Sequence, residues 1–267
     1  MPVRMPDHEI AGEGEVTLFL LHGAYGSRQY YRHEIATLVA RGYRVVAWDA
    51  PGYGLSPLPS PYSIEAAANA CAALVRATGT ATNVLIGHSM GGIIAPLAAV
   101  KLGTEHVQGL VISATVGSFS AKSKEDQRVF LEERVAPLAR GETLSAAAEP
   151  LLRTMLAPGS SGPLVDLVLD VAMQTRSETF VAAINAIVDY EGQPTLERIW
   201  QLETPVLAIA GEQDNVGRPE EMRKLAQNVG GEFVCVPGAA HYAWAEQPEV
   251  FNAALFDFLD RRVRRLP

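Results

Sequence analysis

The chain has 267 residues, of which 48% are hydrophobic and 19% are charged, and its formal net charge is −8. This composition is typical of a globular protein and excludes a disordered or fibrous chain. Basic residues gather only in the tail at 261–265, where they suit the end of a helix, so we expect no nucleic-acid partner.

Two further features bear on the compartment. The opening stretch, MPVRMPDHEIAGEGE, has no apolar core of signal-peptide length, and no later run could span a bilayer. We therefore expect a cytoplasmic protein without a membrane partner. Cys71 and Cys235 each lie in an apolar periodic segment, which predicts buried free thiols.

Strand and helix patterns alternate in the first part of the chain. An edge strand and turn are predicted over residues 8–14. Apolar runs typical of strands buried on both faces follow at 16–21, 44–48, 84–86 and 107–114. Helices are predicted between them at 30–40, 63–78 and 92–100. Such alternation predicts right-handed crossovers and an α/β doubly wound, mostly parallel sheet with helices on both faces.

After residue 114 the alternation stops. Between about 118 and 203 the pattern predicts only helices, at 122–138, 144–156, 164–174 and 178–188. Strand patterns return at 205–210 and 232–236, with helices at 219–228 and 248–262. We therefore predict a core domain made of residues 1–117 and 204–267. Residues 118–203 form an all-helical cap, or lid, inserted before the last two strands.

The segment Gly87-His88-Ser89-Met90-Gly91 fits G-x-S-x-G at a strand-to-helix corner. The chain is cramped there, so the positions two before and two after the serine must lack a Cβ atom. The first amides of the helix, that of Met90 included, would face an oxyanion beside Ser89. A glycine-rich turn without catalytic function can have the same pentapeptide. Whether Ser89 is a nucleophile therefore depends on the rest of the chain.

A serine nucleophile needs a base, and the base needs a carboxylate. Asp214 and His241 each follow one of the last two predicted strands, and the carboxyl ends of neighbouring parallel strands meet at one edge. We therefore predict a Ser89, His241, Asp214 triad. Glu212 is an alternative carboxylate, and Asp49 is a weaker one because its strand precedes the nucleophile.

The loop His22-Gly23-Ala24 follows the strand predicted at 16–21, and the amide of Ala24 is the expected second oxyanion donor. Tyr25 and Tyr30 either line the substrate pocket or only pack, and both interpretations stay open. A glycine pair at 52 and 54 lacks the third glycine of a dinucleotide loop, and the histidines show no ligand spacing. No cofactor or metal is expected.

Five segments, LLHGAYGS, WDAPGYGLS, IGHSMGG, IAGEQD and PGAAHYAWAEQPEVF, together resemble the α/β-hydrolase fold superfamily over essentially the whole chain. The lid-bearing serine hydrolases are the most similar group, in particular esterases and 3-oxoadipate enol-lactonases. Haloalkane dehalogenases and epoxide hydrolases differ because they carry aspartate where this chain has Ser89.

The resemblance implies a serine hydrolase that cleaves a small carboxylic ester or lactone through an acyl-enzyme, as a monomer or homodimer. It does not fix the substrate, because carbon–carbon bond hydrolases of ring-cleavage products and cofactor-free haloperoxidases share the motifs. A ligand receptor that keeps this fold without turnover is a third hypothesis.

Overall fold

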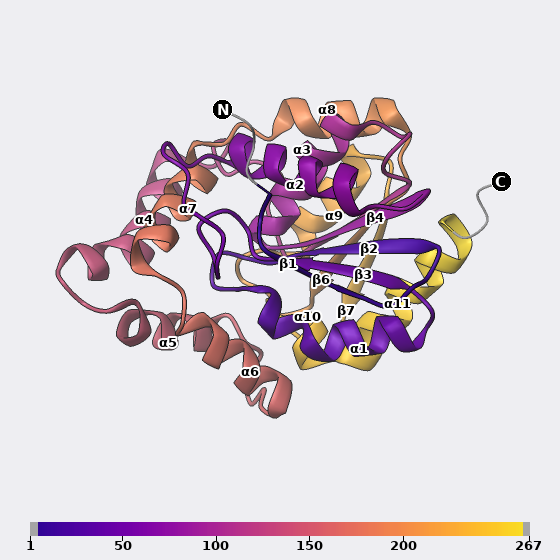
Figure 1. Cartoon of the computed structure of the whole chain (residues 1–267). Helices are drawn as coiled ribbons and strands as arrows, with labels where there is room; N and C mark the ends of the chain where they lie inside the picture. Colours follow the sequence, from indigo (N-terminus) through magenta and orange to yellow (C-terminus); the bar gives the residue numbers. More distant parts are fainter. Residues whose placement is uncertain (1–4, 264–267) are drawn as a thin grey trace.

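The computed structural model describes residues 5–263, and a twisted sheet of seven strands runs through its centre (Figure 1). The strand order is β1-β3-β2-β4-β5-β6-β7, and every neighbouring pair is parallel except β1 with β3. The strands are β1 (His8–Ala11), β2 (Val16–Leu21), β3 (Arg44–Trp48), β4 (Thr82–His88), β5 (Gly109–Ser113), β6 (Val206–Gly211) and β7 (Glu232–Val236). This topology confirms the predicted α/β fold class.

Helices cover both faces of the sheet (Figure 1). One face carries α1 (Arg32–Ala40) and α11 (Pro248–Arg262), and the other carries α2 (Ile64–Thr78), α3 (Met90–Leu102), α8 (Gln193–Leu202) and α9 (Pro219–Asn228). The central strand β4 is therefore buried on both sides, and Val84 and Leu85 are fully buried. Burial on two faces explains why these strands are continuous apolar runs rather than alternating ones.

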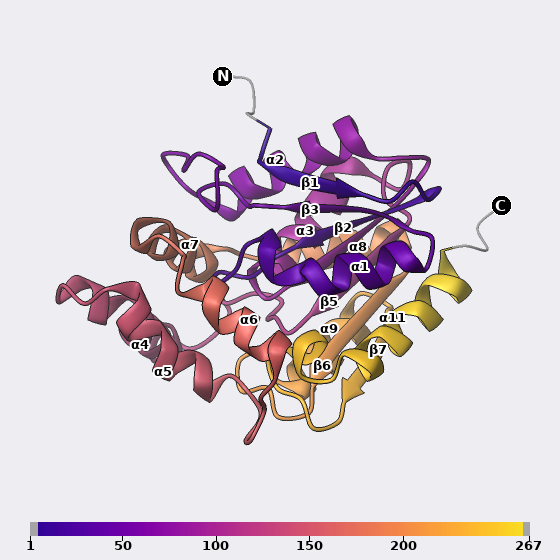
Figure 2. The ribbon, with the colours of Figure 1, turned by 60° about the horizontal axis from the view of Figure 1, so that its bottom comes forward.

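The remaining long helices gather at one end of the sheet (Figure 2). They are α4 (Lys124–Ala139), α5 (Leu144–Thr154), α6 (Pro163–Ala172) and α7 (Ser177–Asp189). Contacts of this group reach the loops that follow the strands: Thr179 Oγ1 donates to the Gly52 carbonyl oxygen at 2.8 Å, and the His241 N–H donates to the Met155 carbonyl oxygen at 2.9 Å. The predicted helical insertion before the last two strands is confirmed.

The helix α8 is absent from the sequence prediction. Its apolar residues Leu196 and Ile199 are buried, while Trp200 is largely exposed. The helix packs against α3 and α9, on a face of the sheet, although its residues fall within the range predicted for the cap. The division into a core and a cap at 118–203 stays a prediction.

Two short helical turns complete these elements: η1 (Arg28–Tyr31), a 3-10 turn, leads into α1, and α10 (Ala243–Glu246) lies between β7 and α11. Both cysteines are free thiols, and Cys71 is buried as predicted. Cys235 is only half-buried, so that part of the prediction is wrong, because β7 is the edge strand of the sheet. Among the helices within 5–263, none has both the length and the apolarity needed to cross a membrane.

Candidate active site

Ser89 lies on the sharp turn between β4 and α3. Its backbone has φ 54° and ψ −115°, a conformation that costs a non-glycine residue free energy, and its side chain is half-buried. A Cβ atom on Gly87 would lie 2.2 Å from the Gly91 carbonyl oxygen, and one on Gly91 would lie 2.1 Å from the Leu21 carbonyl oxygen. Both predicted glycines are therefore required by close backbone approach.

The loop after β2 passes directly beside this serine. A Cβ atom on Gly23 would lie 3.0 Å from the Cβ and 3.5 Å from the Oγ atom of Ser89. The Gly23 N–H already donates to the Tyr30 hydroxyl at 2.7 Å, and the Ala24 carbonyl oxygen accepts from the Tyr53 hydroxyl at 3.0 Å. These bonds hold the loop against Ser89. The Ala24 peptide follows Gly23 directly in this loop.

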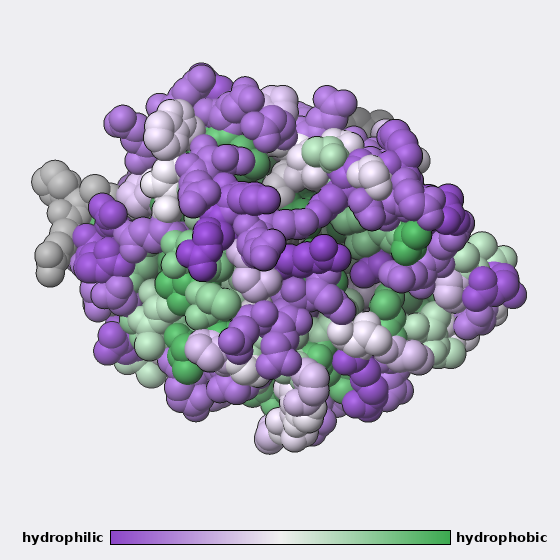
Figure 3. Space-filling model, turned by 180° about the vertical axis from the view of Figure 1, so that it is seen from behind, coloured by the Kyte–Doolittle hydropathy of each residue, from purple (hydrophilic) through white to green (hydrophobic). Residues whose placement is uncertain are grey.

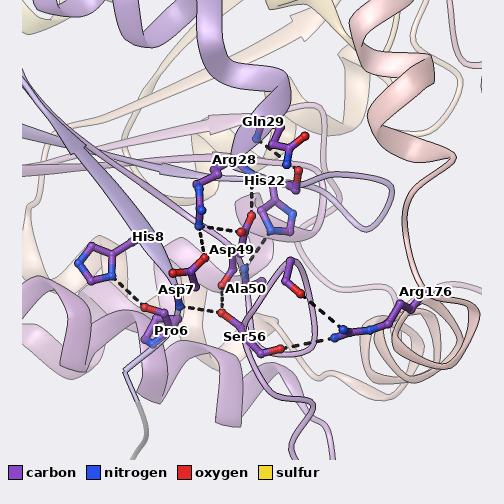
Figure 4. Close-up of polar contacts among 12 residues, drawn as sticks. Pro6, Asp7, His8, His22, Arg28, Gln29, Asp49, Ala50, Ser56 and Arg176 are labelled. Atoms are coloured by element: carbon purple, nitrogen blue, oxygen red, sulfur yellow. Dashed lines mark hydrogen bonds and ion pairs between the residues drawn. The ribbon is translucent and has the colours of Figure 1, made fainter.

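His22 also contacts this loop, and Figure 4 shows its ring beside Ala50. Its Nδ1 donates to the Gly23 carbonyl oxygen at 2.8 Å, and its Nε2 accepts from the Ala50 N–H at 2.9 Å. Burial lowers the pKa of His22, although the nearby Asp49 carboxylate opposes the shift. The neutral ring is the form that can accept at Nε2, so His22 joins the loops after β2 and β3.

His241 and Asp214 meet at the carboxyl ends of β6 and β7. His241 Nδ1 lies 3.0 Å from Asp214 Oδ2 and 3.2 Å from Oδ1, and both residues are buried. Asp214 Oδ1 also accepts from the N–H groups of Val216 and Gly217, at 2.8 and 3.1 Å. Burial alone would raise the pKa of Asp214, but His241 and these two donors outweigh it and lower the pKa. An ionised Asp214 keeps the proton of His241 on Nδ1 and leaves Nε2 able to act as a base.

The two alternative carboxylates make other contacts. Glu212 is exposed, and its Oε2 accepts from the Gly238 N–H at 3.0 Å. Asp49 accepts from the Arg28 N–H at 2.9 Å and forms an ion pair with the Arg28 side chain at 2.8 Å (Figure 4). The carboxylate that the structure places against His241 is that of Asp214.

Tyr25 and Tyr30 make different contacts near Ser89. The ring of Tyr25 packs against that of Phe180 from α7, with centroids 4.4 Å apart. Tyr30 is fully buried, its hydroxyl accepts from Gly23, and its ring packs on Trp244 at 4.9 Å. A role for either tyrosine in binding substrate stays a prediction, whereas the Tyr30 hydroxyl has a structural use in holding the loop.

The sequence prediction missed Glu246, which braces the loop that carries His241. Its Oε1 accepts from the N–H groups of Ala240 and Tyr242 at 3.1 Å each, and its Oε2 accepts from the Ala157 N–H at 2.7 Å. No spacing rule in the sequence identifies a carboxylate that accepts from backbone groups. Only its position within the segment PGAAHYAWAEQPEVF could have suggested a role.

A cavity of about 750 Å³ lies between α4, α5 and the loops after β5 and β6. Apolar residues of its wall include Val116, Phe119, Phe130 and Met155, and five charged residues also line it, namely Lys122, Asp126, Glu133, Arg134 and Arg218. Ser89, Asp214 and His241 are not in this wall, but Val216 donates to Asp214 and Met155 accepts from His241, so the cavity lies next to the His241–Asp214 pair. Its volume is in the range of small-molecule sites. Within 5–263, no group of three or more His, Cys, Asp or Glu residues is arranged to hold a metal ion.

Residues 18–254 match the sequence profile described as "Alpha/beta hydrolase family". Among curated proteins, a pimeloyl-[acyl-carrier protein] methyl ester esterase of Neisseria meningitidis is 26% identical over 253 residues, which cover 91% of this chain and 93% of the relative. The 3-oxoadipate enol-lactonase 2 of Acinetobacter baylyi is 26% identical over 217 residues, covering 80% of this chain and 77% of that one.

Solved structures give the same result. A thermophilic esterase from Thermogutta terrifontis superposes with a TM-score of 0.83 at 27% identity, covering 96% of this chain and 93% of the other. The enol-lactonase from Burkholderia xenovorans has a TM-score of 0.80 with 96% of each chain covered, and at 22% identity it supports the fold alone. The resemblance seen in the sequence to esterases and enol-lactonases is thus confirmed.

Proposed function

Because the chain belongs to the alpha/beta hydrolase family, we propose that it is a serine hydrolase that cleaves a small carboxylic ester or lactone through an acyl-enzyme. The observation that carries the proposal is the contact between His241 and Asp214 at 3.0 Å. The strained turn that carries Ser89, with the Gly23 loop beside it, supports Ser89 as the nucleophile.

In the proposed mechanism, the Ser89 hydroxyl attacks the ester carbonyl carbon while His241 Nε2 accepts its proton. Asp214 holds the imidazole in the required tautomer and stabilises the imidazolium that forms. The N–H groups of Ala24 and Met90 donate to the oxyanion of the tetrahedral intermediate. The amide of Met90 suits this role because the first N–H groups of a helix have no partner within the helix.

The intermediate collapses when His241 gives its proton to the leaving alkoxide, which departs as an alcohol. A water molecule then attacks the acyl-enzyme, again losing a proton to His241, and the carboxylic acid is released as Ser89 recovers its hydrogen. In a lactone, the alcohol and the acid stay on one product molecule.

The size and lining of the 750 Å³ cavity support a small substrate, and the relatives named as esterases and enol-lactonases support an ester or lactone bond. The acid side of the substrate would sit near Ser89 and its remainder under α4 and α5. Phe119, Phe130 and Met155 are among the apolar residues of the cavity wall that it could contact.

The proposal is tested by assaying the wild-type protein and Ser89→Ala on p-nitrophenyl acetate, an aliphatic enol-lactone and a ring-cleavage diketone acid. We expect turnover of an ester or the lactone, and a loss of at least about a thousandfold in Ser89→Ala with an unchanged circular dichroism spectrum. Activity of Ser89→Ala within a few-fold of wild type would reject the nucleophile. Preferential cleavage of the diketone would favour carbon–carbon bond hydrolysis, and binding without turnover would favour a receptor.

A further inference from the structure

A small buried cavity of about 10 Å³ lies between the sheet and helices α1 and α11, beneath the turn that carries Ser89. Most of its wall is apolar, as expected for the interior. Tyr31 is also in the wall, but its hydroxyl already donates to the Leu21 carbonyl oxygen at 3.3 Å. Four further polar side chains come from four different elements, and each is at most 3% exposed. We refer to these four residues as the polar cluster: Glu34 of α1, His88 of β4, Ser113 of β5 and Trp244 of α10.

Polar atoms of the cluster have no hydrogen-bond partner among the residues that the structure describes. These atoms are Glu34 Oε1, both ring nitrogens of His88, Ser113 Oγ and Trp244 Nε1. The other carboxyl oxygen of Glu34 accepts from Asn252 Nδ2 at 3.3 Å. Buried polar atoms are nearly always hydrogen-bonded in native proteins, so several such atoms facing one cavity require a common partner.

The chemistry of the cluster matches a single water molecule. The cavity leaves about 10 Å³ in which the centre of a water molecule can lie, and buried waters make two to four hydrogen bonds. The Trp244 N–H can only donate and the Ser113 hydroxyl can donate, while Glu34 Oε1 and an unprotonated ring nitrogen of His88 can accept. A water accepts two hydrogen bonds and donates two, which is the complement of this set.

We infer that this cavity is a binding site for one structural water molecule, and that the water-linked polar cluster positions the nucleophile turn from below. The positioning part rests on the proposed function, in which Ser89 is the nucleophile. Glu34 is then a positioning residue, since it reaches the reacting atoms only through the water and its neighbours.

The contacts of the cluster lead to each part of the candidate active site. His88 directly precedes Ser89 and is the register partner of Ser113, whose carbonyl oxygen accepts from the Ser89 N–H at 2.9 Å. Trp244 packs on Tyr30, whose hydroxyl holds Gly23 of the oxyanion loop. The turn of the nucleophile and the oxyanion loop are therefore both in contact with the polar cluster or its direct neighbours. Small displacements of catalytic groups lower the reaction rate strongly.

A high-resolution crystal structure of the wild-type protein tests the water site directly. We expect density within hydrogen-bond distance of at least three members of the polar cluster. The same density should persist in crystals of Ser89→Ala, which separates the water site from the proposed chemistry. A cavity without density overturns the inference, whether or not the protein cleaves esters.

Kinetics test the positioning role, with Glu34→Leu removing the acceptor and Glu34→Gln keeping a polar partner of the same shape. On p-nitrophenyl acetate we expect Glu34→Leu to lower kcat by at least about tenfold with KM changed by less than about twofold, and Glu34→Gln to stay within about threefold. His33→Leu, on the exposed side of the same helix, is the matched control and should match wild type.

An unchanged kcat in Glu34→Leu would overturn the positioning role, and so would an equal loss in both Glu34 variants. If Glu34→Leu does not fold, Ser113→Ala replaces it. That variant removes a donor of the water without adding bulk, and a kcat within about twofold of wild type would again overturn the role.

Discussion

Ser89 is held in a conformation that its own backbone disfavours, and its neighbours keep it there. Its N–H donates to the Ser113 carbonyl oxygen at 2.9 Å, and the Gly92 N–H donates back to the Ser89 carbonyl oxygen at 2.9 Å. Strain of this kind persists only where the surroundings over-determine it. At the residue scale, the geometry of the proposed nucleophile is therefore a property of β4, β5 and α3 together.

Asp214 is expected to matter through the orientation and charge of His241. Asp214→Asn keeps the shape of the side chain but removes its charge and can favour the wrong tautomer of the imidazole. We expect kcat to fall by up to about ten-thousandfold with little change in substrate binding, measured by steady-state kinetics. The control is Glu212→Gln, which should remain near wild type. The opposite ranking of the two variants would show that Glu212 is the functional acid.

Glu34 makes stability depend on pH. Burial raises the pKa of Glu34 to about 7, although the amide of Asn252 opposes the shift. The other titratable groups that face it are neutral, because burial raises the pKa of Tyr31 and lowers that of His88. The carboxyl group titrates near 4.5 in the unfolded chain, so its contribution to stability is complete below that pH and is lost as the pH rises through about 7.

Glu34→Gln cannot ionise and should escape this loss. Relative to wild type, we expect its free energy of unfolding to be higher by about 3 kcal/mol at pH 8 and similar at pH 4. Urea unfolding at the two pH values measures the difference, with the exposed Glu249→Gln as control. A difference that does not change with pH would contradict the raised pKa.

At the scale of elements, helices α6 and α7 contact η1, α10 and α2, and hydrogen bonds also join the inserted helices to loops of the rest of the chain. Thr179 of α7, and Arg176 just before it, donate to the Gly52 carbonyl oxygen in the loop after β3 (Figure 4). On the opposite side, Glu246 of α10 accepts from Ala157 of the segment after α5. These bonds join the segment after α5 to α10, next to the loop of His241, and α7 to the loop after β3.

Glu246→Ala removes an acceptor from three backbone N–H groups at once. Because unsatisfied buried donors are costly, we expect the free energy of unfolding to fall by about 2–3 kcal/mol. The loop that carries His241 also loses its brace, so kcat should fall as well. Urea unfolding and steady-state kinetics provide the measurements, and Glu249→Ala in the exposed first turn of α11 is the control. Wild-type stability and rate in Glu246→Ala would show that the brace is dispensable.

At the scale of the whole molecule, the surface of the described residues is mixed in hydropathy on the face that Figure 3 shows. Hydrophilic side chains dominate the face seen in Figure 3, with hydrophobic ones in separate patches. Large hydrophobic side chains that are exposed within the described residues come from different elements, namely Met5, Ile10, Leu55, Val129, Trp200 and Val250. The formal net charge of −8 disfavours attraction to anionic lipid surfaces.

The rate on p-nitrophenyl esters should therefore fall from acetate or butyrate towards palmitate, because the cavity under α4 and α5 has the volume of a small-molecule site. No increase is expected when the substrate exceeds its solubility limit. Initial rates across the ester series, with and without dispersed substrate, measure both. A preference for palmitate or activation at an oil–water interface would indicate a lipase instead.

Local patterns in the sequence determined most of the framework. The strands at 16–21, 44–48 and 232–236 and the helices at 219–228 and 248–262 coincide with the observed elements, because strands buried on two faces and amphipathic helices leave a direct hydrophobic signature. The glycines around Ser89 were also predictable, since a backbone contact only about 2 Å from any added Cβ atom admits no other residue.

Only the tertiary structure decided which side chains meet across the fold. Asp214 and Glu212 are only two positions apart in one loop, so sequence spacing does not distinguish them. Which of them contacts His241 depends on how the loops after β6 and β7 dock. Glu34 meets Asn252 across 218 residues of chain, and Glu246 meets Ala157 across 89. Such contacts depend on the packing of helices on a sheet, which no local spacing encodes.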